Sequence, residues 1–183
     1  MPLPLHVSPD TPPGGPAGLE IRSAGWRDLS AVAGVQRRAF PPRFAYSLST
    51  LVVLWALPWV HLLIARRAGK TVGCVIADRV LDGNRIVNLA VDPAAQRQGI
   101  GAALLHAAEC ALPAGDMTLM VQTGNAAARA LYHRVGYEEE TVHPHYYGSG
   151  SPGIKMRKRR GAPPPAMLSC RDSGSVAGEG KRD

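Results

Sequence analysis

The sequence predicts an α/β domain with a mixed central sheet of about seven strands and helices on both of its faces. Short segments with the two-residue alternation of strands are interspersed with segments whose apolar residues recur every three or four positions, as in helices. Turns rich in glycine and proline separate these segments, and the predicted order is β-α-α-β-β-β-α-β-α-β-β. At 183 residues, the chain is long enough for one such domain and too short for two of ordinary size.

The N-terminal third predicts one strand and two helices. Residues 19–22 are expected to form the strand, and Asp28 begins a helix that Pro41 and Pro42 end. The residues expected on the apolar side of this helix are Leu29, Val32, Ala33 and Phe40. Ser47 or Ser49 can cap the second helix, which runs through Leu57. The apolar run that includes this helix, residues 51–65, is shorter than the roughly 20 residues that span a bilayer, and we expect it to lie in the core.

The middle of the chain predicts an antiparallel meander. Residues 60–66 and 71–78 form a hairpin around Gly69, and residues 82–84 give the next turn signal. Residues 85–91 alternate as a third strand, which Asp92-Pro93 ends.

The C-terminal half predicts two amphipathic helices between strands. Residues 99–112 carry an apolar stripe formed by Ile100, Leu104, Ala108 and Leu112. A strand at 117–122 follows, and then a helix at 125–135 with Ala127, Leu131 and Val135 facing inward. Residues 137–142 and 154–158 complete the expected sheet.

Composition divides the chain into three parts. We expect a flexible leader rich in proline and glycine at residues 1–18, the folded domain at residues 19–160, and a disordered basic tail at residues 161–183. The formal net charge is +7, of which residues 155–183 contribute +5, so the rest is nearly neutral. The basic run at residues 155–160 could attract RNA phosphates, or it could simply be solvated.

Cysteine usage indicates a reducing compartment. Cys74, Cys110 and Cys170 are odd in number, far apart and without CxxC spacing, which argues against both a disulfide framework and a zinc site. The first eighteen residues lack the charged-then-apolar layout of a secretory signal. We therefore expect a cytoplasmic protein without a metal and without a membrane segment.

The segment that carries the chemistry lies between a predicted strand and a predicted helix and reads VDPAAQRQGIGA at residues 91–102. The first turn of a helix has free N–H groups and a partial positive charge, so it binds an anion where side chains leave room. Gly99 and Gly101 leave that room, and Arg97 adds a full positive charge. A P-loop would need Lys-Ser/Thr after the last glycine, and a dinucleotide fingerprint would need a third glycine where Leu104 stands.

This segment resembles the pyrophosphate-binding signature of the GNAT superfamily of N-acetyltransferases, (Arg/Gln)-x-x-Gly-x-(Gly/Ala), through Gln96, Gly99 and Gly101. Residues 125–137, NAAARALYHRVGY, resemble the later helix of the same family and the strand that follows it. The resemblance implies the GNAT fold and acetyl-CoA as the acetyl donor. It also implies direct transfer to a primary amine, with no covalent enzyme intermediate.

The resemblance assigns the cofactor to two stretches of backbone. Leu89, Ala90 and Val91 would pair with the pantetheine amides and polarise the thioester carbonyl. The pyrophosphate would lie on a loop formed by Gln96, Arg97, Gln98, Gly99, Ile100, Gly101 and Ala102. The glycines also fit a plainer interpretation, in which they only satisfy the geometry of the turn.

Asn125 and Tyr132 receive roles from the same resemblance. They are seven residues apart and so share one helix face, where Asn125 would contact the pantetheine arm and Tyr132 would protonate the departing thiolate. A phenol of pKa near 10 can give a proton to a thiolate whose conjugate acid lies near 8.5. Asn125 is also a good helix N-cap, and a tyrosine on a helix is often a packing residue.

The acceptor side resembles the RimI-like branch, which acetylates protein N-termini, ribosomal proteins among them. Tyr146-Tyr147-Gly148 resembles the loop that covers the peptide in that branch, although both tyrosines also fit half-buried packing. Met120 stands where RimI-like relatives carry a glutamate or histidine as base, and residues 38–46 lack the usual tryptophan after the proline. An α-amine of pKa near 8 depends least on such a base. A relay could instead use one of His143, His145, Glu138, Glu139 and Glu140.

Three functions are compatible with these residues. The first is acetylation of a protein or peptide α-amine. The second is acetylation of a small amine such as a polyamine, an amino acid or an antibiotic, which would require acidic groups near the acceptor; residues 138–140 could supply them. The third is a non-catalytic acetyl-CoA-binding module, which the absence of a base at Met120 favours and the presence of Tyr132 disfavours.

Overall fold

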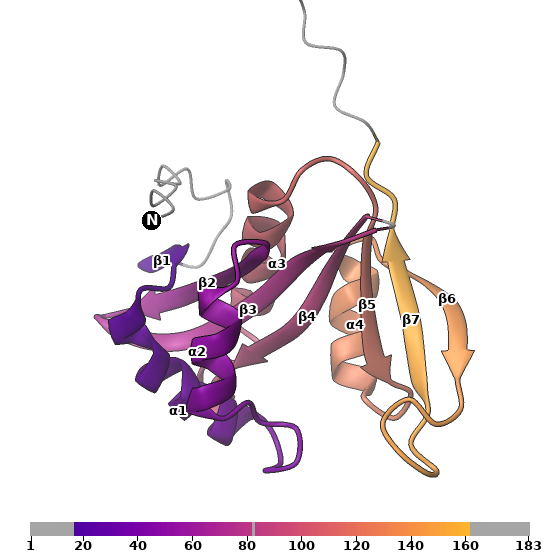
Figure 1. Ribbon diagram of the computed structural model, residues 1–183, viewed down its shortest axis with the longest axis horizontal. Helices are drawn as coiled ribbons and strands as arrows, with labels where there is room; N and C mark the ends of the chain where they lie inside the picture. Colours follow the sequence, from indigo (N-terminus) through magenta and orange to yellow (C-terminus); the bar gives the residue numbers. More distant parts are fainter. Residues whose placement is uncertain (1–16, 82, 162–183) are drawn as a thin grey trace, which may run out of the picture.

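The computed structural model describes residues 17–81 and 83–161 as one α/β layered unit (Figure 1). Apart from residues 17, 18 and 161, the expected leader and tail lie outside this part of the chain. The predicted order of strands and helices is confirmed, with two additional short 3-10 helices at Trp26–Asp28 and Pro93–Ala95. None of the helices in the described part of the chain combines the length and apolarity that a membrane crossing needs.

Seven strands form a single sheet in the order β1-β2-β3-β4-β5-β7-β6. Their bounds are β1 Leu19–Ser23, β2 Val60–Arg67, β3 Lys70–Val80, β4 Gly83–Val91, β5 Met117–Gln122, β6 Glu138–His143 and β7 Gly153–Lys158. Strands β4 and β5 are parallel, and every other pair of neighbours is antiparallel. The mixed sheet predicted from the sequence is thus confirmed.

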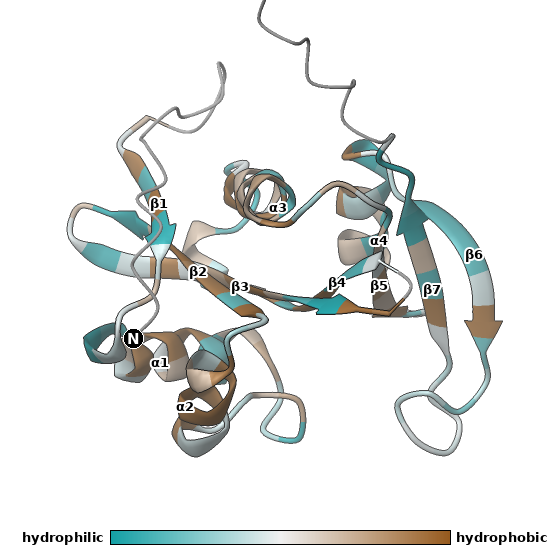
Figure 2. Cartoon of the chain, turned by 45° about the horizontal axis from the view of Figure 1, so that its top comes forward, coloured by the Kyte–Doolittle hydropathy of each residue, from teal (hydrophilic) through white to brown (hydrophobic). Residues whose placement is uncertain are grey.

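The helices cover both faces of the sheet (Figure 2). Helices α1 (Leu29–Ala39) and α2 (Leu48–Ala56) lie on one face, and α3 (Ile100–Ala111) and α4 (Ala126–Arg134) lie on the other. Ser47, one of the two predicted caps of α2, accepts a hydrogen bond from the backbone N–H of Thr50 at 3.2 Å. The predicted apolar stripe of α3 is confirmed, because all four of its residues are buried.

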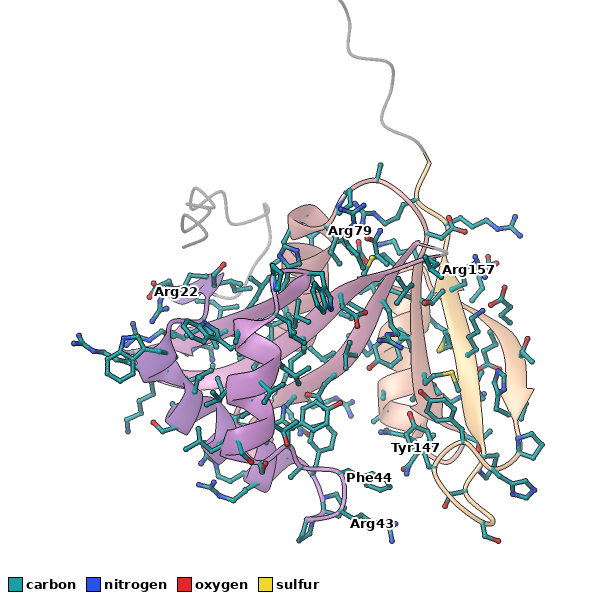
Figure 3. The ribbon with its side chains drawn as sticks, viewed as in Figure 1. Arg22, Arg43, Phe44, Arg79, Tyr147 and Arg157 are labelled. Atoms are coloured by element: carbon teal, nitrogen blue, oxygen red, sulfur yellow. The ribbon has the colours of Figure 1, made fainter. Side chains whose placement is uncertain are left out.

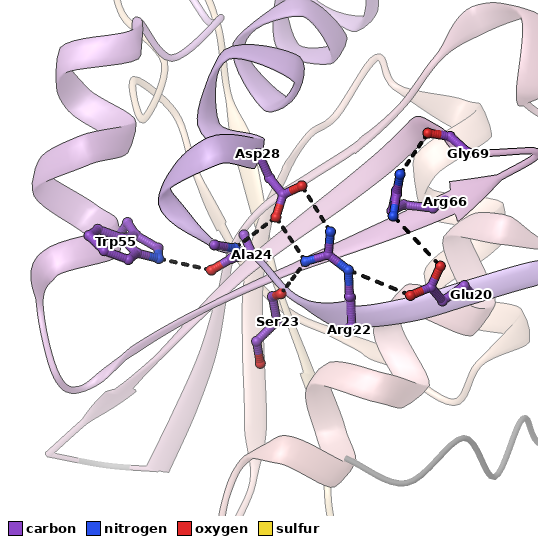
Figure 4. Close-up of polar contacts among 9 residues, drawn as sticks. Glu20, Arg22, Ser23, Ala24, Asp28, Trp55, Arg66 and Gly69 are labelled. Atoms are coloured by element: carbon purple, nitrogen blue, oxygen red, sulfur yellow. Dashed lines mark hydrogen bonds and ion pairs between the residues drawn. The ribbon is translucent and has the colours of Figure 1, made fainter. Parts of the chain in front are cut away.

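Polar contacts join the first strand to the helices on its face (Figure 4). The Arg22 guanidinium donates two hydrogen bonds to the Asp28 carboxylate, at 2.8 and 2.9 Å. The Trp55 indole N–H donates to the carbonyl of Ala24 at 2.8 Å, which ties α2 to the end of β1.

Strand β4 separates from β5 halfway along its length. The pairing is limited to three positions, which end at Ile86 and Leu119. At the same place a register shift between Ile76 and Ala77 of β3 leaves Val87 without a direct partner on β3. Such a bulge bends a strand and increases its twist. The C-terminal half of β4 is therefore paired with β3 alone. Figure 1 shows β4 and β5 splaying apart at this end.

Backbone direction along β4 follows from its last contact with β3. The N–H of Asp92 donates to the carbonyl of Val72 at 2.8 Å, so it points toward β3. Because backbone groups alternate along an antiparallel strand, those of Ala90 also point toward β3, and those of Leu89 and Val91 point the other way. The backbone of Leu89 and Val91 thus faces the side from which β5 has separated.

Two expectations about helix burial are wrong. The apolar run at residues 51–65 is only partly core: Leu51 is fully buried, whereas Val53 is 60% exposed and Trp59 is 51% exposed. Helix α2 has a single neighbouring layer, so only one of its sides can be covered. In α4, Ala127 is exposed and Ala128 packs inward, because a strict four-residue spacing drifts around a helix of 3.6 residues per turn.

One expectation about a loop is wrong. We expect Asn84 in a turn, but it lies within β4 and is buried, with its side chain donating to the carbonyl of Pro113 at 3.1 Å. The predicted strand at residues 154–158 is confirmed as β7, so the basic run at residues 155–160 begins inside the sheet. Lys155, Arg157 and Lys158 belong to β7, and each forms an ion pair with a carboxylate.

The unequal burial of α2 gives a matched test of its packing. Leu51→Ala should lower the free energy of unfolding by about 2–5 kcal/mol, because it leaves a cavity in a filled core. Val53→Ala, on the same helix, should change it by less than about 0.5 kcal/mol. Urea unfolding measures both, and similar losses in the two variants would contradict the described orientation of α2.

Candidate active site

The loop between β4 and α3 has the backbone of an anion-binding site. Arg97 and Gly99 both adopt positive φ angles, 62° and 78°. Alternation of left- and right-handed residues makes successive N–H groups converge on one point, a geometry that binds anions. No side chain caps α3 at Gly99, so the N–H groups of its first turn are open to a ligand. A non-glycine residue at positive φ is strained, and such strain is typical of functional loops.

Side chains hold this loop in place from three directions. Asp92 accepts from the N–H of Ala94 at 3.1 Å and from the Arg38 guanidinium at 2.6 Å. Gln96 donates to the carbonyl of Val91 at 3.1 Å. Gln98 accepts a hydrogen bond from Arg67 at the end of β2.

Arg67 contacts the loop, and the sequence analysis did not predict this contact. Its side chain meets Gln98, 31 positions further along the chain, only because the hairpin of β2 and β3 lies beside the loop. Its Nε is buried without a partner among the described residues. No local pattern around Arg67 indicates this contact.

Glycine is required at the two positions of the motif for different reasons. Gly99 is needed for its left-handed backbone. At Gly101, a Cβ atom would lie 3.0 Å from the Leu131 side chain of α4, so the absence of a Cβ also makes room for that side chain. The role of Gly101 in leaving room for an anion stays a prediction. Ile100 is buried in the core and Ala102 is half-buried, so they can serve a ligand only through their backbone.

Tyr132 lies on α4 with its ring against that of Tyr137, at a centroid distance of 6.0 Å. Burial, together with the nearby Tyr147, holds the pKa of the Tyr132 phenol well above its usual value. Tyr132 therefore keeps its proton at neutral pH, as a proton donor must. Asn125 caps the same helix, because its side-chain oxygen accepts from the N–H of Ala128 at 3.1 Å. Only the amide N–H groups of Asn125 are left for a ligand.

The tyrosine pair packs as a cluster with the loop between α1 and α2. The rings of Tyr146 and Tyr147 are 4.8 Å apart, and Phe44 meets Tyr147 at 5.9 Å. The Arg43 guanidinium lies 4.8 Å from the centre of the Phe44 ring (Figure 3). Burial raises the pKa of Tyr147 to about 12, while Tyr146 is 52% exposed. Segments about a hundred residues apart thus meet beside Tyr132.

Met120 lies under the β6–β7 loop that carries Tyr146 and Tyr147, which we call the tyrosine loop. A Cβ atom on Gly153 would be 3.0 Å from the Met120 methyl carbon, 3.0 Å from Cβ of Tyr146 and 3.1 Å from the Tyr147 ring. The structure thus brings the predicted base position and the predicted peptide-binding residues together. At this position the chain offers a thioether, which cannot accept a proton from an amine at neutral pH.

Two of the three glutamates of β6, Glu139 and Glu140, are paired with basic groups. Glu139 bonds to Arg129 at 2.8 Å and contacts His133 at 3.1 Å, and these partners lower its pKa. Glu140 pairs with Lys155 at 2.9 Å and with Arg157 at 2.8 Å, and its pKa is lowered in the same way. Carboxylates held in this way are weaker bases and offer less charge to a cationic substrate. Within the described residues, no cluster of His, Cys, Asp and Glu could hold a metal ion.

Comparison with known proteins identifies the family of the chain. Residues 58–139 match the model of the acetyltransferase (GNAT) domain. The chain is 30% identical over 148 residues to an uncharacterized N-acetyltransferase of Methanocaldococcus jannaschii, covering 76% of this chain and 91% of that protein. It is 35% identical over 130 residues to the [ribosomal protein bS18]-alanine N-acetyltransferase of Escherichia coli, covering 69% and 86%.

A solved structure agrees with the sequence comparison. The crystal structure of the ribosomal-protein-S18-alanine N-acetyltransferase from Escherichia coli aligns with a TM-score of 0.70 at 29% identity, over 82% of this chain and 98% of that chain. The fold and the site therefore define an N-acetyltransferase. The chain belongs to the GNAT acetyltransferase family, and its relatives include RimI-type enzymes.

The close packing at Gly153 gives a test of the tyrosine loop. Gly153→Ala should displace Met120 and the tyrosine pair, at a cost of about 1 kcal/mol, and raise KM for the amine acceptor about fivefold. KM for the acetyl donor should not change. Gly161→Ala is the control, because none of the described residues lies within 4 Å of the added atom. Equal acceptor KM values in both variants would show that the packing under the loop has no part in acceptor binding.

Proposed function

We infer that the protein transfers an acetyl group from acetyl-CoA to the α-amine of a protein or peptide N-terminus. The observation that carries this proposal is the proximity of Tyr147 to Tyr132, close enough to raise the pKa of that phenol, in a sheet whose β4 separates from β5. A proton donor, a peptide-covering loop and unpaired strand backbone then border one place. The relatives named for ribosomal-protein alanine acetylation make a ribosomal protein N-terminus the first acceptor to test.

The residues present fit the proposed cofactor. The convergent N–H groups around Arg97 and Gly99 suit a pyrophosphate, and the orphaned Nε of Arg67 supplies a further donor beside the same loop. The backbone of Leu89 offers a donor and an acceptor to the amides of a pantetheine arm, as an added strand would. The amide N–H groups of Asn125 face the same helix side as Tyr132. Acetyl-CoA, when bound, supplies the activated thioester.

The reaction needs little from the enzyme beyond placement and one proton. The acceptor nitrogen forms a bond to the acetyl carbon as the carbon–sulfur bond breaks, and Tyr132 gives its proton to the departing thiolate. The neutral α-amine is present at a useful fraction near pH 7, because its pKa is near 8. The proton lost from the acceptor passes to water, and Tyr132 takes a proton back from water before the next turnover. A base at position 120 is therefore dispensable for an α-amine.

The alternative acceptor class, small cationic amines, has less support. It requires free carboxylates near the acceptor, but two of the three candidates, Glu139 and Glu140, are each held by two basic groups. The tyrosine pair presents phenols, which suit hydrogen bonds to a peptide backbone. The division into a catalytic domain at residues 19–160 with a leader and a tail stays a prediction, and so does the cytoplasmic location.

Removal of the Tyr132 hydroxyl tests the proton donor. Tyr132→Phe should lower kcat about a hundredfold or more, while the Kd for acetyl-CoA stays within about twofold. Tyr137→Phe is the matched control: its ring adjoins Tyr132, but its hydroxyl donates to Glu109 at 3.3 Å and should affect only stability. Steady-state release of CoA thiol measures turnover, and an unchanged kcat in Tyr132→Phe would refute the assigned role.

The pH dependence tests the absence of an enzymic base. Because the amine must be neutral, kcat/KM should rise with pH and level off above a pKa near 8 that belongs to the acceptor. Tyr132 must keep its proton, and its raised pKa delays any decline to well above that range. Two peptides with different α-amine pKa values should show correspondingly different midpoints. A common midpoint near 6.5 would instead indicate a histidine base such as His143 or His145.

A further inference from the structure

An ion pair with no role in the acetyl-transfer step lies at the start of β4. Asp78 of β3 and Arg85 of β4 are direct cross-strand partners. The Arg85 guanidinium donates two hydrogen bonds to the Asp78 carboxylate, at 3.1 and 2.6 Å. Asp78 is only 8% exposed, whereas the side chain of Arg85 is 46% exposed. The buried carboxylate therefore fixes the orientation of a guanidinium that remains accessible.

Strand alternation places Arg85 on the same face as Met120. The neighbouring residues Ile86 and Leu119 pack into the core under α3, so Arg85 and Met120 project from the opposite face of the sheet. This is the face that carries α1 and α2, and we call its part around Arg85, Met120 and the tyrosine pair the acceptor face.

Two phenols lie near Arg85. The guanidinium interacts electrostatically with Tyr146 of the β6–β7 loop and with Tyr46 of the segment between α1 and α2. Tyr46 and Tyr146 in turn interact with each other. Arg85 thus lies between the two segments that border the proposed peptide site.

The pair is neutral overall, and what it offers a ligand is the remaining N–H donors of an oriented guanidinium. Both carboxylate oxygens of Asp78 are engaged by Arg85, which weakens Asp78 as a base. A guanidinium has five N–H donors, and Asp78 takes two of them. The donors that remain are suited to a carboxylate, which guanidinium binds by charge-assisted and often bidentate hydrogen bonds.

The position of Arg85 relative to the reacting atoms fits the start of a peptide. Arg85 is four residues before Leu89, or about 13 Å along the strand, and its side chain spans part of that distance. An extended acceptor advances about 3.5 Å per residue from its α-amine. The groups within reach of Arg85 are therefore the first and second side chains. Arg43, which lies over Phe44 in the same aromatic cluster, adds a second cation at the rim.

We propose that Arg85, held by Asp78, is a specificity-determining residue that selects acceptor N-termini with a carboxylate side chain at the first or second position. This inference rests on the proposed acetylation of peptide α-amines and names the acceptor class for that activity. The phenols of Tyr46 and Tyr146 complete the hydrogen bonding around the acceptor carboxylate.

The test uses the full-length protein with acetyl-CoA and peptides that differ only at position 1 or 2. Each position carries Asp or Asn in one pair and Glu or Gln in another, so the members of a pair differ in charge and not in size. Wild-type protein should favour the acid over its amide by at least about tenfold in kcat/KM at one position, which corresponds to about 1.4 kcal/mol.

Three variants assign this preference to the ion pair. Arg85→Gln should bring the acid-to-amide ratio close to one. Because that variant leaves Asp78 unpaired and could unfold, Asp78→Asn/Arg85→Gln replaces the ion pair with two neutral amides and should give the same loss. Arg79→Gln is the matched control: Arg79 adjoins Asp78 on β3 but projects from the opposite face, and the ratio should stay at the wild-type value.

The possible outcomes distinguish failure of this inference from failure of the proposed acetylation of peptide α-amines. Acetylation of the peptides by wild-type protein with a ratio near one, or a wild-type ratio that persists in the folded Arg85 variants, overturns the selection of acids and leaves the proposed function standing. The absence of product from every peptide, with acetyl-CoA binding intact, overturns both.

Discussion

The arrangement of the site depends on one backbone feature, the separation of β4 from β5 after Ile86. The register shift on β3 leaves one residue of β4 unmatched, and the strand bends away from its parallel neighbour. The backbone of Leu89 and Val91 thereby loses a strand partner on one side. In a continuous sheet the same N–H and C=O groups would be hydrogen-bonded to β5, and a ligand could not pair with them. The phosphate-binding loop, Tyr132 and the tyrosine loop then lie around this separation.

The loop that follows β4 shows how binding capacity and strain come together. Arg97 and Gly99 adopt left-handed backbone, which turns several N–H groups toward one point and leaves them without partners in the fold. Neighbouring side chains, above all Asp92 with Arg38 and Gln98 with Arg67, hold this conformation. The strain at Arg97 is thus maintained by contacts from α1 and β2. An anion that accepts hydrogen bonds from those N–H groups would supply the partners that the rest of the protein does not provide.

The acceptor side is chemically unlike the cofactor side. Met120 stands at the usual position of a base, and Glu139 and Glu140 of β6 are paired with basic side chains. What the acceptor face offers instead is a set of phenols around an oriented guanidinium. An enzyme of the kind we propose would rely on the low pKa of its acceptor amine for deprotonation and would use its charged groups for selection.

The sequence by itself determined the order of the elements, the α/β class and the location of the glycine-containing loop between β4 and α3. These follow from local patterns: the periodicity of Ile100 and Leu104, the cap at Ser47 and the glycine at position 99. Only the tertiary structure decided which side of α2 is covered, that Gly101 serves helix packing, and that Arg85 meets Asp78 and two tyrosines. These depend on strand register and on contacts between segments far apart, and one-residue shifts in register reverse the face to which every side chain points.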